Sequence, residues 1–158
     1  MSDVKIVEVK PQRVIGMRRR GFYPDMGEMF KELFTYVMKS QSVNIAAAPV
    51  FVCHETTERE WKEAMEKGNA DIEICIPISG DIDETDDYKV YELEGGTMAM
   101  TIHEGPYEEC TPAYERLFKW IYENGYSVTG FTREVYISDP AKVPPEELIT
   151  QIYAPVGK

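Results

Sequence analysis

Cysteine and histidine are scarce in this chain, which has three cysteines and two histidines among 158 residues. The cysteines lie far apart and form no CxxC pair, so we expect free thiols that behave as small apolar side chains. His54 follows Cys53 directly, but two histidines supply few ligands for a zinc-type site, and we therefore expect no metal. The three cysteines are Cys53, Cys75 and Cys110.

Long hydrophobic runs are also missing from the chain. No stretch approaches the roughly 18 consecutive apolar residues that a membrane-spanning helix requires. The N-terminal residues 1–5 lack the basic and apolar segments of a signal peptide. We therefore expect a cytoplasmic protein with no membrane partner.

Positive charge is in the minority, with 17 basic residues against 28 acidic ones and a formal net charge of −11. Such a surface repels the phosphate backbone of nucleic acids. The run Arg18-Arg19-Arg20 lies in a predicted strand, where neighbouring side chains alternate between the two faces. It therefore forms no single basic patch, and we expect no direct nucleic-acid partner.

What the chain does contain is an internal repeat. When the sequence is shifted by 84 positions, residues 4–37 fall on 88–121 without a gap, and 49–52 fall on 133–136. The apolar positions and the turn residues agree between the copies, which indicates a duplicated unit. We therefore expect a single domain over residues 1–158, in which repeat 1 spans 4–78, a linker spans 79–87 and repeat 2 spans 88–156.

Each repeat shows the pattern of two strands, a helix and two further strands. In repeat 2, the pair Gly95-Gly96 between two alternating runs predicts a tight hairpin turn. Thr111 or Pro112 opens the helix, and Asn124-Gly125 closes it. The expected strands are 88–94, 97–104, 131–138 and 149–156 in repeat 2, and 4–9, 13–20, 49–54 and 70–78 in repeat 1, which also has a helix over 25–39 and a short helix after a capping box at Thr57.

Apolar residues at helical spacing define the face that each main helix turns towards its sheet. Two such units can pair edge to edge, which predicts an α+β fold with one curved, mainly antiparallel eight-stranded sheet and two main helices on one face. A groove is then expected between the helices, where ligand pockets tend to lie. The expected helix faces are Phe30, Leu33, Phe34 and Val37 in repeat 1, and Tyr114, Leu117, Phe118 and Ile121 in repeat 2.

The residue that breaks the repeat is Glu134. Strand 131–138 alternates, so Glu134 and Tyr136 share one face, whereas the aligned residues of repeat 1 are the apolar Val50 and Val52. If that face lies under its helix, the carboxylate is partly desolvated among aromatic rings and needs a partner or a proton. The residues alone leave a second interpretation open, in which Glu134 lies on the solvent face and the aromatic stripe is ordinary core.

Several short motifs occur in a characteristic order and spacing. They are His103-Glu-Gly-Pro-Tyr107, Ala113-Tyr-Glu-Arg-Leu-Phe-Lys-Trp120, Arg133-Glu-Val-Tyr-Ile-Ser-Asp-Pro140 and Tyr153-Ala-Pro-Val156. Together they resemble the GyrI-like family, the effector-binding domains of AraC-type and MerR-type multidrug regulators. The resemblance is clearest over 88–156 and extends through the repeat to nearly the whole chain. Because the sequence shows no helix-turn-helix segment, we expect a stand-alone member.

The resemblance implies a pocket for bulky, cationic or aromatic compounds in the groove between the two repeats. Glu134 is then expected at the floor of the groove, where it pairs with a ligand cation between aromatic walls. No cofactor is implied. The residues implied in ligand binding are Glu134, Tyr136, Tyr114, Tyr107, Phe118, Phe30 and Val52, while Phe51 is expected on the opposite face.

Three functions are compatible with the resemblance. The first is a stand-alone module that binds or senses an amphipathic compound. The second is a hydrolase of electrophilic, cyclopropane-type compounds, in which Glu134 activates water and Tyr114 or Tyr136 donates a proton. The third is a gyrase-inhibitor-like protein that acts on a protein partner. Because no Ser-His-Asp order and no phosphate-binding loop occurs, the sequence favours the binding module over an enzyme.

Overall fold

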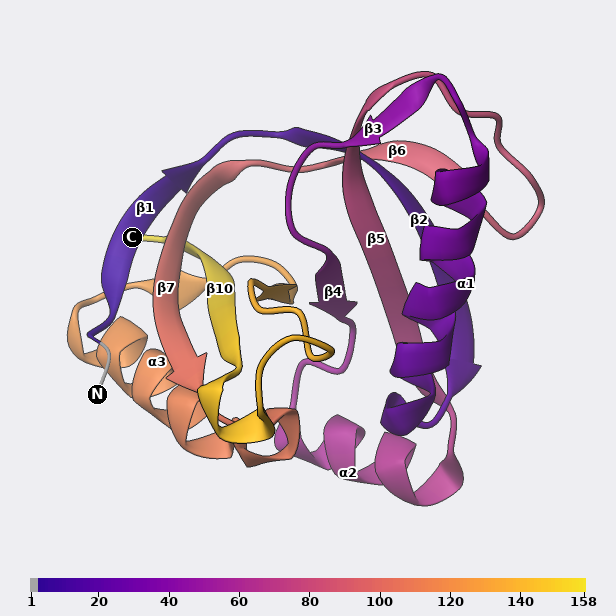
Figure 1. Cartoon of the computed structure of the whole chain (residues 1–158). Helices are drawn as coiled ribbons and strands as arrows, with labels where there is room; N and C mark the ends of the chain where they lie inside the picture. Colours follow the sequence, from indigo (N-terminus) through magenta and orange to yellow (C-terminus); the bar gives the residue numbers. More distant parts are fainter. Residues whose placement is uncertain (1–2) are drawn as a thin grey trace. The chain divides into compact units, whose positions relative to one another are not determined.

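The computed structural model describes residues 3–158, which form two compact units (Figure 1). Unit 1 contains residues 3–10 together with 95–158, and unit 2 contains 11–94. Each unit has one main helix packed on an antiparallel sheet of four principal strands. The predicted α+β class, built from duplicated and mainly antiparallel units, is therefore confirmed.

In unit 2 the strand order is β6-β2-β5-β4, with the short β3 beside β5. The main helix α1 buries Met29, Leu33 and Val37. The shorter helix α2 begins at the predicted place, because the Thr57 hydroxyl accepts a hydrogen bond from the backbone N–H of Glu60 at 3.0 Å. The elements are β2 (Gln12–Gly21), a 3-10 turn (Tyr23–Asp25), α1 (Met26–Lys39), β3 (Val43–Ile45), β4 (Val50–Cys53), α2 (Glu58–Lys67), β5 (Ala70–Gly80) and β6 (Lys89–Leu93).

In unit 1 the strand order is β1-β7-β10-β9, with the two-residue β8 beside β10. The main helix α3 packs Ala113, Leu117 and Ile121 against inward residues of β7 and β10. Within residues 3–158, no helix has both the length and the apolar character needed to cross a membrane. The elements are β1 (Lys5–Val9), β7 (Gly96–Glu104), a 3-10 turn (Tyr107–Glu109), α3 (Thr111–Glu123), β8 (Ser127–Val128), β9 (Thr132–Tyr136), a 3-10 turn (Pro145–Glu147) and β10 (Ile149–Gly157).

The two sequence repeats exchange their first strands. Strand β1 lies beside β7, and β6 lies beside β2, so each repeat completes the sheet of the other (Figure 1). The predicted hairpin across Gly95-Gly96 is therefore wrong, since β6 and β7 belong to different units. A type I′ hairpin turn requires positive φ at both central residues, and of this glycine pair only Gly96 has one, at 129°.

The buried helix faces are rotated by one position from the prediction. Leu33 and Leu117 are fully buried as expected, but Phe30 and Tyr114 are only partly buried, and Phe118 is 41% exposed. In α3 the small Ala113 takes the inward position beside Leu117, and a small side chain lets a helix approach its sheet closely. The large aromatic rings consequently lie on the flank of the helix, where they can contact groups beyond the core.

Candidate functional site

The two carboxylate oxygens of Glu134 are each held by a tyrosine hydroxyl. Strand β9 alternates, so Glu134 and Tyr136 point to the same face, and the Tyr136 hydroxyl donates to Oε1 at 2.9 Å. The Tyr114 hydroxyl reaches down from the flank of α3 and donates to Oε2. The carboxylate is therefore fixed from two elements, its own strand β9 and the helix α3.

Further aromatic rings surround this tyrosine pair. Tyr107, in the turn before α3, packs edge-on against Tyr136, with ring centroids 5.2 Å apart and planes at 68°. Phe118, one helical turn beyond Tyr114, stacks on it at 6.1 Å and 27°. The result is a cluster of four aromatic side chains, two of which contact the carboxylate directly, and Phe118 remains 41% exposed.

Burial dominates the electrostatics of Glu134. Desolvation raises the pKa of this carboxyl above its ordinary value, while the hydrogen bonds from Tyr114 and Tyr136 and the nearby His103 oppose the rise. The pKa of Tyr136 is well above its ordinary value because the hydroxyl is buried beside the Glu134 charge. Among the described residues 3–158, no lysine or arginine forms an ion pair with Glu134. The site therefore contains a desolvated carboxylate that lacks a matching cation.

The structure brings together five of the seven predicted site residues. Glu134, Tyr136, Tyr114, Tyr107 and Phe118 form the contacts just described, all within unit 1. This placement supports the first interpretation, a carboxylate under its helix, over a carboxylate on the solvent face. The other two predicted residues, Phe30 and Val52, belong to unit 2.

Strand register corrects the alignment of the third strands by one residue. Glu134 pairs with Ile152 on β10, and Phe51 pairs with Ile74 on β5. These two isoleucines occupy equivalent positions in the two repeats. Ile152 pairs with Thr101 on β7 and Ile74 pairs with Met17 on β2, and Thr101 and Met17 are 84 positions apart, the offset of the repeat. Phe51 is therefore the counterpart of Glu134, and the expectation that Phe51 lies on the opposite face is wrong. A role for Val52 in ligand binding stays a prediction, but the alignment that suggested it is lost.

Thr150 is a residue of this face that the sequence did not single out. It lies directly across from Tyr136 on one side and from His103 on the other. The residue is 1% exposed, and its hydroxyl has no hydrogen-bond partner within residues 3–158. The available signal was the alternation of β10, in which Thr150 is the polar member of an inward row that continues with Ile152 and Ala154.

Metal-binding side chains do not gather near this carboxylate. Within the part of the chain that the structure describes, no group of three or more histidine, cysteine or acidic side chains could hold a metal ion. His103, the nearest histidine in the electrostatics of the site, has its Nε2 at 2.8 Å from the carbonyl oxygen of Pro106.

Comparison with known protein families gives one match over nearly the whole chain. Residues 2–157 match the GyrI-like small molecule binding domain. A comparison with curated proteins found no match.

Solved structures share the fold. The C-terminal domain of EcmrR is 23% identical, with a TM-score of 0.88, and the alignment covers 100% of this chain and 99% of that one. EcmrR in a DNA complex gives 23% identity and a TM-score of 0.87 over 99% of this chain, which spans only 58% of that longer protein. A hydrolase encoded by lin2189 from Listeria innocua is 15% identical, with a TM-score of 0.67, and the alignment covers 98% of this chain and 92% of that one. SAV2435 bound to tetraphenylphosphonium is 12% identical, with a TM-score of 0.59, and the alignment covers 98% of this chain and 94% of that one.

Proposed function

The chain belongs to the GyrI-like family of small-molecule-binding domains, effector modules that occur in transcription regulators, and we propose that it binds bulky aromatic cations at Glu134. The observation that carries this proposal is a carboxylate held by the hydroxyls of Tyr114 and Tyr136, whose rings pack on Phe118 and Tyr107, with no lysine or arginine ion pair among residues 3–158. A cation at this position would supply the missing charge.

The physical basis is the low polarity around the carboxylate. An ion pair is stronger in a site from which water is partly excluded than in bulk water. The two tyrosine hydroxyls hold the carboxylate in one orientation before the ligand arrives, so less ordering accompanies binding. The aromatic faces add cation–π attraction of about 0.5–2 kcal/mol each. These terms together favour a ligand that is both charged and aromatic.

A fold relative adds support for the ligand class. SAV2435 was solved with tetraphenylphosphonium, a cation with four aromatic rings and no hydrogen-bonding groups. Such a ligand can be recognised only through charge and aromatic contact, the two features gathered around Glu134. A cytoplasmic location is part of the same proposal, since the regulators that contain this domain act on DNA.

The test is calorimetric titration of tetraphenylphosphonium into the wild-type chain, Glu134→Gln and the matched control Glu123→Gln. The glutamine side chain retains the size and one acceptor oxygen of Glu134 but removes the charge, so we expect at least about tenfold weaker binding, as for the loss of one desolvated ion pair. Glu123 is exposed at the end of α3, and its substitution should leave the affinity unchanged. Equal affinities for all three proteins would refute the proposal.

A hydrolase is the second candidate. A carboxyl of raised pKa that contacts two phenol hydroxyls is an arrangement that can activate water and stabilise a leaving oxygen. The hydrolase from Listeria innocua shares the fold. Incubation with an electrophilic cyclopropane compound decides between the two, because a hydrolase gives product that depends on Glu134, whereas a binding module returns the compound unchanged.

A further inference from the structure

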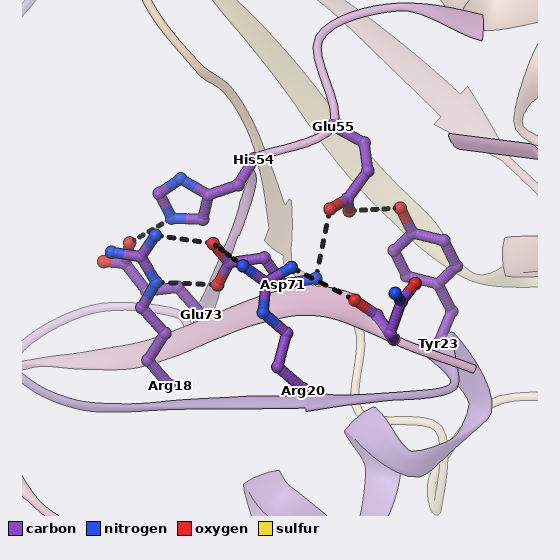
Figure 2. A network of polar contacts seen from close by, with 8 residues as sticks. Arg18, Arg20, Tyr23, His54, Glu55, Asp71 and Glu73 are labelled. Carbon is purple, nitrogen blue, oxygen red and sulfur yellow. Dashed lines mark hydrogen bonds and ion pairs between the residues drawn. The ribbon is translucent and has the colours of Figure 1, made fainter. Parts of the chain in front are cut away.

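Unit 2 contains its own pairing of a carboxylate with aromatic rings, centred on Glu55. Figure 2 shows the Tyr23 hydroxyl directed at this carboxylate, where it donates to Oε1. The backbone N–H of Asp71 donates to Oε2 at 3.0 Å. Like Glu134, Glu55 is thus held from two elements by neutral donors.

The charges in the surrounding network single out Glu55. The Arg18 guanidinium donates two hydrogen bonds to the Asp71 carboxylate, of 2.7 and 2.6 Å (Figure 2). The Glu73 carboxylate contacts Nε2 of His54 at 2.7 Å. Two of the three acids therefore have a basic partner. Glu55 has none, since no ion pair involves it among residues 3–158.

Aromatic rings lie next to this unmatched charge. The Tyr23 ring stacks on Trp61 of α2 at 6.1 Å, with planes only 22° apart, and meets Phe51 edge-on at 6.2 Å. Trp61 nevertheless stays 41% exposed. Met65, one turn further along α2, and Phe22, whose ring lies over Gly68 at the end of the helix, extend the exposed apolar surface.

We propose that Glu55, Tyr23 and Trp61 form a cation-recognition site of unit 2, which takes a quaternary ammonium or phosphonium ion, or a flat aromatic cation. The carboxylate supplies the charge, and the open surface of Trp61 supplies a cation–π contact that Tyr23 supports by stacking. Exposed aromatic surface beside an acid without a base favours a positively charged ligand over a neutral or anionic one. The assignment uses none of the residues around Glu134.

Trp61 is also the reporter for the test. The chain has two tryptophans, and Trp120→Phe leaves Trp61 as the only one. Tetraphenylphosphonium titrated into this variant should quench the fluorescence of Trp61 in a saturable way. Adding Glu55→Gln should weaken this response by about tenfold or more. Glu58→Gln, an equal change of charge at an exposed position in the first turn of α2, should leave it unchanged.

A second variant removes the ring and keeps the acid. Trp61→Leu, followed by calorimetry, should bind the phosphonium several-fold more weakly, whereas its circular dichroism spectrum should match that of the wild type. This variant keeps the test valid if Glu55→Gln disturbs the backbone at Asp71. A quench that is the same with and without Glu55→Gln, or the absence of any quench, would overturn the assignment.

Glu134→Gln in the same fluorescence assay separates the two proposals. A Trp61 response lost in Glu134→Gln but kept in Glu55→Gln would overturn the unit 2 site and support the proposal for Glu134. A response that needs Glu55 supports the unit 2 site, whatever Glu134→Gln does.

Discussion

Replacing Thr150 by valine should make the protein more stable, although the substitution lies at a fully buried position near the start of β10. The Thr150 hydroxyl is buried without a hydrogen-bond partner among residues 3–158. A buried polar group left unpaired costs about 1–3 kcal/mol, and valine fills nearly the same volume with a methyl group. We therefore expect a gain of about 1 kcal/mol or more. For a chain of this length, each kcal/mol raises the melting temperature by about 2–4 °C.

Thermal unfolding followed by circular dichroism, without ligand and at neutral pH, measures this gain. Thr150→Ser is the matched control, because it keeps the hydroxyl and removes the methyl group, and it should lower the melting temperature. A melting temperature that falls in Thr150→Val would refute the reasoning, since it would show that the hydroxyl is paired in solution by a buried water.

Two further predictions concern the core and the charge of unit 1. Leu117→Ala should destabilise the chain by about 2–5 kcal/mol, because this side chain on the inner face of α3 is fully buried. Urea unfolding should then show a lower midpoint concentration. The control Tyr122→Ala, at an 85% exposed position of the same helix, should change the midpoint little. Because burial raises the pKa of Glu134, its protonated form contributes stability that is fully present below the ordinary value of 4.5 and is lost as the pH rises through the raised folded pKa. The affinity for a cation should change in the opposite sense and fall as the pH falls through that pKa. If the difference in melting temperature between the wild type and Glu134→Gln stayed constant as the pH changed, the predicted pH dependence of stability would be contradicted.

Local features of the fold could be predicted because their causes are local. The start of α2 follows from Thr57, whose hydroxyl caps the helix, and the end of α3 follows from Asn124-Gly125, and both lie where the sequence placed them. Strand partners are not determined in this way. The pair Gly95-Gly96 permits a hairpin between β6 and β7 but does not require one. The pairing of β6 with β2 and of β7 with β1 depends instead on contacts between residues far apart in the chain.

The site shows the same division between local pattern and long-range packing. Alternation along β9 correctly placed Glu134 and Tyr136 on one face, and the helical spacing carried Tyr114 close to them. The comparison with repeat 1 was less secure, because one residue more or fewer in a connecting loop moves every side chain of the next strand to the other face. Because of this one-residue shift, the sequence comparison assigned Val50 as the counterpart of Glu134, whereas the strand register assigns Phe51.

The corrected counterpart strengthens the case for a functional Glu134. At the same strand position, unit 2 has Phe51, a side chain only 3% exposed that contributes apolar burial to its unit. The backbone therefore accepts a large apolar residue here, and folding alone gives no reason for an acid. Unit 1 instead has a carboxylate whose pKa is raised by burial and which requires two tyrosine hydroxyls to hold it. A residue that opposes stability where its duplicate supports it is best explained by what it binds.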